Sequence, residues 1–210
     1  MAGGRTIGKI GSHTHPEEAH VTVDDILRDL PSIETERLVL RNLRMEDAED
    51  MFEYGRDPEI AFRGLWPPLE SLEESQADIA DALEGYATGG NMSWAIEHRA
   101  DRKMIGRIGL GPYSRMNRRA EVGYAMNRHY WGQGLATEAV RGVVGFAFRQ
   151  LGLNRVQAIV LPDNTGSMRV LEKAGMQREG LLRKYQYVLG DYCDVYMYAL
   201  LRSDWEAAGR

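Results

Sequence analysis

One segment of the chain has the residue types and spacing of an anion-binding turn. It reads Trp-Gly-Gln-Gly-Leu-Ala-Thr-Glu over residues 131–138. Gly132 and Gly134 have no Cβ, so the backbone there can turn tightly and approach a ligand closely. The helix expected to follow offers N–H groups without intrahelical partners and the positive end of its dipole. This arrangement suits a pyrophosphate, although two glycines alone are better explained by an ordinary strand-to-helix turn.

Motifs of several other chemistries are absent from the sequence. It contains no Gly-Lys-Ser/Thr phosphate-binding loop, no His-Glu-x-x-His, no Gly-x-Ser-x-Gly and no Cys-x-x-Cys. Its one cysteine, Cys193, excludes an intrachain disulfide and a cysteine-based metal centre. His13, His15 and His20 fall in a glycine-rich N-terminal stretch that does not preorganise a metal site. We therefore expect no bound metal.

The charged residues are unevenly distributed along the chain. The formal net charge is −5, yet residues 46–85 hold thirteen Asp or Glu and two Arg, whereas residues 99–128 hold eight Arg or Lys and two acids. Solvated helix faces explain such a pattern; the alternative is one region that attracts a cationic ligand and another that attracts an anion. The negative total argues against nucleic acid as a partner.

Length and hydrophobicity predict one soluble domain preceded by a tail. A chain of 210 residues with 43% hydrophobic content can bury a sizeable core. No apolar run approaches the ~18–20 residues of a membrane span, and the N-terminus lacks the apolar core of a signal peptide. We expect a cytoplasmic protein with no membrane partner. Residues 1–32 are predicted to form a flexible tail with a short helix near 22–30, and residues 33–210 the domain.

The hydrophobic periodicity predicts an α+β fold built on a mixed, mostly antiparallel sheet of seven strands with helices on both faces. Gly55 and Pro58 are expected to end the first helix, and an aromatic, proline-rich loop is expected over Phe62–Pro68. The step from the fourth strand to the fifth is long enough for a parallel crossover. The expected strands are 38–43, 93–98, 104–110, 120–126, 156–161, 181–188 and 195–201, and the expected helices are 45–54, 72–86, 134–151 and 164–174.

Five segments, in this order, resemble the Gcn5-related N-acetyltransferases (GNAT), and most closely their RimJ/RimL branch, which acetylates ribosomal-protein N-termini. The resemblance covers about residues 33–205. It departs from the family at Trp131, where Gln or Arg is usual. The segments are Glu34–Arg41, Ala120–Tyr124, Trp131–Ala136, Asn164–Met176 and Glu179–Asp194.

The resemblance implies a GNAT fold, splayed at the fourth and fifth strands, with acetyl-CoA as cosubstrate between them. It implies that the pantetheine arm pairs with the fourth strand near Tyr124, Ala125 and Met126, and that Asn164 contacts this arm. Arg169 and Lys173 are expected to be solvated. The implied pyrophosphate loop comprises Gly132, Gln133, Gly134, Leu135, Ala136 and Thr137.

The resemblance also implies direct attack of an amine on the acetyl thioester. An α-amino group has a pKa near ~7.7–8.0, against ~10.4 for lysine, so it needs only a weak base. Glu179 is the first candidate for this base and Glu121 the second. Ser167 is the candidate acid for the leaving thiolate. Each of the three also fits a structural hydrogen bond.

The resemblance favours a protein or peptide N-terminus as the acceptor amine. The alternatives are a small-molecule amine, such as a polyamine, an amino sugar or an antibiotic, and a non-catalytic acyl-CoA-binding module. Loops that line a substrate site vary freely on one scaffold, so the sequence does not choose among these acceptors. We expect a monomer or a homodimer.

Overall fold

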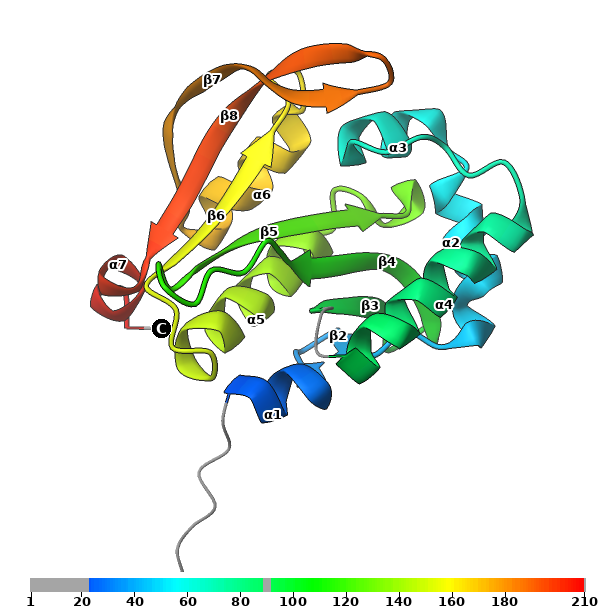
Figure 1. Cartoon of the computed structure of the whole chain (residues 1–210), viewed down its shortest axis with the longest axis horizontal. Coiled ribbons are helices and arrows are strands. Elements are labelled where there is room, and N and C mark those ends of the chain that lie inside the picture. Colours follow the sequence, from blue (N-terminus) through cyan, green and yellow to red (C-terminus); the bar gives the residue numbers. More distant parts are fainter. Residues whose placement is uncertain (1–22, 89–91, 210) are drawn as a thin grey trace, which may run out of the picture.

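The chain folds around one mixed sheet of eight strands (Figure 1). The computed structural model describes residues 23–88 and 92–209. The strands lie in the order β1-β2-β3-β4-β5-β6-β8-β7 and are β1 (Ile33–Glu34), β2 (Leu38–Arg41), β3 (Ser93–His98), β4 (Lys103–Leu110), β5 (Arg119–Met126), β6 (Arg155–Val160), β7 (Gln177–Val188) and β8 (Asp191–Leu201). The α-helices are α1 (Val23–Arg28), α2 (Ala48–Gly55), α3 (Pro58–Gly64), α4 (Leu72–Thr88), α5 (Leu135–Arg149), α6 (Thr165–Ala174) and α7 (Arg202–Ala207), and the 3-10 helices are η1 (Met45–Asp47) and η2 (Arg128–Tyr130).

The predicted fold class is confirmed, with one strand more than the seven expected. The additional strand, β1, is two residues long and pairs antiparallel with β2, Ile33 opposite Leu40 and Glu34 opposite Val39. Two residues are too short to produce a recognisable alternation, so the sequence pattern does not reveal this strand.

The sheet opens between β5 and β6. Among the described strands this is the one parallel pair, and its register covers only Arg119–Glu121 against Arg155–Gln157. Beyond Glu121, β5 stays paired with β4 as far as Met126, while β6 stays paired with β8, so the two strands diverge (Figure 1). Within the described residues, 122–126 of β5 therefore have no strand partner on the β6 side. This is the splay expected between strands 120–126 and 156–161.

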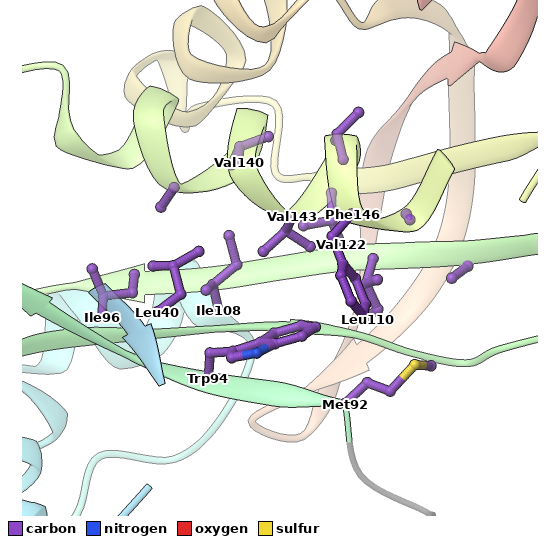
Figure 2. Packing of buried hydrophobic residues seen from close by; sticks show 14 of the residues in the cluster. Leu40, Met92, Trp94, Ile96, Ile108, Leu110, Val122, Val140, Val143 and Phe146 are labelled. Carbon is purple, nitrogen blue, oxygen red and sulfur yellow. The ribbon is translucent and has the colours of Figure 1, made fainter. Parts of the chain in front are cut away.

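Helix α5 covers one face of the sheet. Its Val140, Val143 and Phe146 point at strand residues of that face, among them Trp94 and Ile108 (Figure 2). The Trp94 and Phe146 rings meet edge-on with centroids 5.4 Å apart. Successive side chains of a strand alternate between faces, so the apolar residues of β3 and β4 in register with Trp94 share this core. The packing fixes the direction of α5, and with it the position of the helix's first turn.

Helices α2 and α4 lie on the other face and are held there by ion pairs. Arg107 of β4 pairs with Asp78 of α4 at 2.9 Å, and Lys103 of β4 pairs with Glu53 of α2 at 2.5 Å. Arg128 of η2 also reaches the acidic segment. Three basic residues of 99–128 thus pair with acidic residues of 46–85: Lys103, Arg107 and Arg128. For these residues, ion pairing within the fold explains part of the uneven charge distribution.

The packed part of the chain begins before residue 33, where the sequence places the start of the domain. Ile26, Leu27 and Leu30 are each at most 8% exposed and belong to the core. The Nε1–H of Trp94 donates to the carbonyl oxygen of Pro31 at 2.9 Å. Residues 23–32 are therefore part of the folded unit, because their apolar side chains complete its core. Residues 1–22, including the three histidines, lie outside the described residues.

Part of the loop expected over Phe62–Pro68 is helical. Pro58 does not end the preceding helix; it opens α3, since proline fits the first turn, where its missing N–H has no partner to lose. The Asp57 carboxylate caps this helix by accepting from the backbone N–H groups of Glu59 (2.9 Å) and Ile60 (3.4 Å). The short C-terminal helix α7, anchored by the buried Trp205, was also not expected.

Candidate active site

Two adjoining cavities lie at the open edge of β5. The larger, about 810 Å³, fills the gap between β5 and β6 and reaches the first turns of α5 and α6. The smaller, about 440 Å³, lies between β4 and β5 on one side and α2 and α4 on the other. Both are lined by Gly64, Glu121, Gly123, Tyr124 and Ala125. The two cavities therefore adjoin along β5, so ligands bound in them would lie next to each other.

The glycine-rich loop forms one end of the larger cavity. Gly132 and Gly134 have φ values of 75° and 81°, which a residue with a Cβ adopts only with strain. Gly134 is the N-cap of α5, so the first N–H groups of this 15-residue helix are open to the cavity. Of the predicted loop residues, Gly132, Gly134, Leu135, Ala136 and Thr137 line the cavity.

Gln133 is the predicted loop residue whose side chain turns away. It is absent from the cavity wall, and its Nε2–H donates to the carbonyl oxygen of His129 at 3.0 Å. Its own carbonyl oxygen accepts from the Arg37 guanidinium at 2.9 Å. Gln133 therefore contributes to the shape of the loop rather than to the cavity lining.

A cluster of polar side chains ties the loop to the start of the sheet. The Glu138 carboxylate accepts from the Thr35 hydroxyl at 2.6 Å, from the Arg37 backbone N–H at 2.8 Å and from the Arg37 guanidinium at 2.8 Å. Burial alone would raise the pKa of Glu138, but these hydrogen bonds outweigh it and lower the pKa. Glu138 therefore stays ionised and holds the first turn of α5 against the β1–β2 turn.

The predicted strand contacts Tyr124, Ala125 and Met126 all line the larger cavity. The Nε1–H of Trp131 donates to the Met126 carbonyl oxygen at 2.7 Å, and the Arg128 guanidinium stacks on the Trp131 ring. Trp131 thus satisfies the last carbonyl of the open strand. This contact gives a structural role to the one residue at which the loop departs from the GNAT pattern.

Ser167 and Asn164 meet Tyr124 at the start of α6. The hydroxyl oxygens of Ser167 and Tyr124 are 2.7 Å apart and share a hydrogen bond in which either is the donor. The Asn164 side-chain oxygen caps α6 by accepting from the Ser167 backbone N–H at 3.1 Å. Burial raises the pKa of Tyr124 well above its ordinary value, so this phenol stays protonated. The pair places two hydroxyl groups on the cavity wall.

Glu121 lies where the two cavities join. Burial raises the pKa of its carboxyl group above the ordinary value of 4.5, and the opposing effect of a hydrogen bond from Gln157, 3.2 Å from the carboxylate, is smaller. No cation forms an ion pair with Glu121 in the described part of the chain. The carboxyl group therefore has the raised proton affinity expected of a general base.

Glu179, the first candidate from the sequence, lines neither cavity. Its carboxylate forms two hydrogen bonds to the Arg155 guanidinium, at 2.8 and 2.6 Å, and this partner lowers the pKa of Glu179. Arg155 opens β6 at the end where β5 and β6 are still paired. The tertiary structure thus places Glu179 away from the splay and pairs its charge with Arg155, which makes Glu179 less suited than Glu121 to act as the base.

Several cavity residues were not identified from the sequence. Arg169 and Lys173 of α6 are exposed, as expected, and both also line the larger cavity. They sit one helical turn apart, at i and i+4, and that spacing is the signal that places both on one face. Tyr54, Asp78 and Arg107 line the smaller cavity. They are far apart in sequence and form no motif, so no local pattern predicts them.

Metal-ligand clusters and membrane-spanning helices are both absent from the described ranges 23–88 and 92–209. No group of three or more His, Cys, Asp or Glu is arranged to hold a metal ion in this part of the chain. None of the helices described there is long and apolar enough to cross a membrane.

Comparison with known proteins identifies relatives of this fold and site. A family model described as an acetyltransferase (GNAT) domain matches residues 37–177. "Uncharacterized N-acetyltransferase YoaA" of Bacillus subtilis is 36% identical over 173 residues, which cover 82% of this chain and 97% of YoaA. "Putative ribosomal N-acetyltransferase YdaF" of the same organism is 37% identical over 176 residues, which cover 81% of this chain and 94% of YdaF.

A solved structure shares both the fold and part of the sequence. RimJ of Mycobacterium smegmatis, solved in complex with CoA-disulfide, superposes with a TM-score of 0.70 and 27% sequence identity. The match covers 86% of this chain and 95% of RimJ.

Proposed function

The chain belongs to the GNAT family and is an N-acetyltransferase, and from this premise we propose that it transfers an acetyl group from acetyl-CoA to the α-amino group of a protein or peptide N-terminus. Acetyl-CoA, when bound, supplies the thioester that the amine attacks directly. We also propose that the enzyme acts in the cytoplasm as a monomer or homodimer, with neither nucleic acid nor membrane as a partner.

The position of Glu121 is the observation that carries the proposal. Its carboxyl group lines both cavities, so it can meet an amine that enters from the smaller cavity. Burial raises its pKa, and a carboxylate of raised pKa takes up a proton more readily at neutral pH. Glu121 thus accepts the proton that the amine releases as the new C–N bond forms.

The larger cavity has the features needed to hold acetyl-CoA. The N–H groups at the start of α5 and the bare backbone at Gly132 and Gly134 suit the pyrophosphate. The unpaired edge of β5 offers backbone groups to the amides of the pantetheine arm. Arg169 and Lys173 supply positive charge to the phosphates from the opposite wall.

The leaving thiolate needs a proton or a hydrogen-bond donor. Ser167 and Tyr124 supply two hydroxyl groups at the cavity wall, and the hydrogen bond between them lets one replenish the other. Because the pKa of Tyr124 is raised, its phenol acts by donating a hydrogen bond to the sulfur or to Ser167 rather than by ionising. We assign Ser167 as the acid and Tyr124 as its partner.

The strength of the base favours an α-amino group as the acceptor. A carboxylate is a weak base, and an α-amine with a pKa of ~7.7–8.0 is partly neutral at pH 7, whereas a lysine amine with a pKa of ~10.4 is not. The relative YdaF bears the name of a putative ribosomal N-acetyltransferase, which supports a protein substrate for this chain.

Release of free thiol from acetyl-CoA tests the proposal. The acceptors would be short peptides with free Ala, Ser or Met N-termini, the same peptides with blocked N-termini and an internal lysine, spermidine, and an aminoglycoside. We expect turnover with the free N-termini. Faster turnover with spermidine or the aminoglycoside would overturn the proposed acceptor class. Thermal stabilisation by acetyl-CoA without any thiol release would leave a non-catalytic acyl-CoA-binding module.

A further inference from the structure

The smaller cavity has apolar walls and a floor made of glycine. Gly109 of β4 and Gly123 of β5 are register partners, and both line the cavity. A Cβ built at Gly123 would meet no atom within 4 Å, so the absence of a side chain there leaves open space. The side walls are apolar and include Met51, Trp66 and Met92. A cavity of this size and lining suits an uncharged apolar group.

The charged groups in this cavity sum to one net negative charge. Arg107 donates from Nη1 to the Asp78 carboxylate at 2.9 Å, and from Nε and Nη2 to the Ser93 hydroxyl at 3.2 and 3.1 Å. The charges of Arg107 and Asp78 cancel each other. Glu121 is then the one carboxyl group of the cavity lining without a cationic partner. The cavity therefore complements a single ammonium group.

Tyr54 contributes a phenolic hydroxyl group to the lining of this cavity. Tyr54 is 3% exposed and lines the cavity, and its hydroxyl has no hydrogen-bond partner among the described residues. Burial raises its pKa, and the charges of Arg107 and Asp78 act on it, so the hydroxyl lies near that ion pair and stays protonated. A hydroxyl group that lacks a protein partner at a cavity wall can donate a hydrogen bond to an acceptor atom of a ligand.

We propose that this cavity selects an acceptor with one ammonium group on an uncharged, apolar first residue, and that the Tyr54 hydroxyl donates to the carbonyl oxygen next to the amine. This inference rests on the proposed function and specifies its substrate: a peptide beginning with a residue such as leucine or methionine. A second ammonium group would meet either the apolar walls or the Arg107–Asp78 pair, whose carboxylate Arg107 already neutralises, so polycations such as spermidine are disfavoured.

Calorimetric binding to the full-length protein in the presence of CoA tests the selection without requiring turnover. The ligands would be peptides that differ only in a first residue of Leu, Lys or Asp, together with spermidine and 3-methylbutylamine, an apolar amine that has no carbonyl group. We expect the Leu peptide to bind about tenfold or more tightly than the Lys and Asp peptides and spermidine. Equal or tighter binding of spermidine would overturn the proposal.

A tyrosine variant tests the carbonyl contact. Tyr54→Phe should lower the affinity for the Leu peptide by about tenfold and leave the affinity for 3-methylbutylamine unchanged. The matched control is Tyr198→Phe, which removes a buried hydroxyl that bonds Glu172 outside both cavities and should leave both affinities unchanged. Equal effects of Tyr54→Phe on the two ligands, or no effect on either, would contradict the contact.

Thiol release separates this inference from the proposed function. If the Leu peptide binds selectively but releases no thiol, the proposed reaction fails and the selectivity stands. If all the peptides release thiol at the same kcat/KM, the function stands and the selectivity fails. If no acceptor binds at millimolar concentration with CoA present, the inferred substrate is wrong.

Discussion

Glu121 and Glu179 show how the surroundings of a carboxylate decide its chemical role. Both lie on strands of the same sheet, yet Glu179 has a bidentate arginine partner that lowers its pKa, whereas burial raises the pKa of Glu121. A carboxylate that is already paired gains little by taking up a proton. The half-buried carboxylate without a cationic partner is therefore the one suited to accept a proton from a substrate.

Glu121→Gln should lower kcat by about 10²–10⁴-fold, because the variant removes the base and preserves its shape. Glu179→Gln, which removes only a half-exposed ion pair worth about 0.2–1 kcal/mol, should keep kcat within about twofold of wild type. Steady-state thiol release measures both. The opposite ranking of the two variants would restore Glu179 as the base.

Activity should also decline on the acid side of neutrality. The pKa of Glu121 is raised, so its carboxylate form is present above that pKa and is lost as the pH falls through it, at a higher pH than for an exposed glutamate. A pH profile of kcat in wild type measures this limb. The profile would contradict the assignment if the limb were absent above pH 4.5, the ordinary value for a glutamate.

Replacing Glu121 should change folding stability in the direction opposite to its effect on activity. The pKa of the Glu121 carboxyl group is about 4.5 in the unfolded chain and higher in the folded protein. The free energy of unfolding therefore falls as the pH rises from the unfolded pKa to the folded pKa, and the loss is complete above the folded pKa. Glu121→Gln should therefore raise Tm at pH 7 and change it little at pH 4. Calorimetric unfolding of both proteins at the two pH values measures this effect. A lower Tm for the variant at pH 7 would indicate that Glu121 is needed for the structure.

At the scale of elements, the cavity for the phosphates depends on how the first turn of α5 is held. Helix α5 is fixed along its length by the core, and Glu138 ties its first turn to Thr35 and Arg37. Arg37 in turn donates to the Gln133 carbonyl oxygen within the loop. The β1–β2 turn thus positions the N–H groups of α5, although it lines neither cavity.

Glu138→Gln should raise the KM for acetyl-CoA by about tenfold and change kcat at saturating acetyl-CoA much less, because loop misplacement affects binding more than proton transfer. Glu206→Gln, which removes an exposed ion pair within α7, is the control and should change neither value. Thiol release at varied acetyl-CoA concentration measures both. An unchanged KM in the Glu138 variant would show that the loop keeps its shape without this contact.

At the scale of the whole molecule, the large cavity is an opening in the sheet between two halves of the fold. One half carries β5 with its glycine-rich loop, and the other carries β6 with α6 (Figure 1). A ligand in this opening contacts both halves, so binding should stabilise the native state as a unit.

Acetyl-CoA at about 100 times its Kd should add roughly 2.7 kcal/mol of stability and raise Tm by about 5–10 °C. The double variant Arg169→Ala, Lys173→Ala should show a smaller shift at the same ligand concentration, because it lacks two cations of the cavity wall. Thermal unfolding with and without ligand measures both shifts. Equal shifts would place the phosphates away from α6.

Features that depend on local order along the chain could be predicted from the amino-acid sequence alone. The alternating and helical patterns predicted the α+β class, and the glycines at 132 and 134 predicted the turn before α5, because these signals depend on neighbouring residues. The order of five segments predicted the GNAT family. Boundaries were less accurate where a proline could either end a helix or begin one, as at Pro58.

Only the tertiary structure decided which side chains share a site. It separated Glu179 from the cavities and brought Glu121 to the wall common to both, although both residues fit the role of base in the sequence. It paired Lys103, Arg107 and Arg128 with residues of the acidic segment, and it brought Tyr54, Asp78 and Arg107 together from three elements. The physical reason is that burial, pairing and pKa depend on neighbours far away along the chain, and a local pattern carries no information about them.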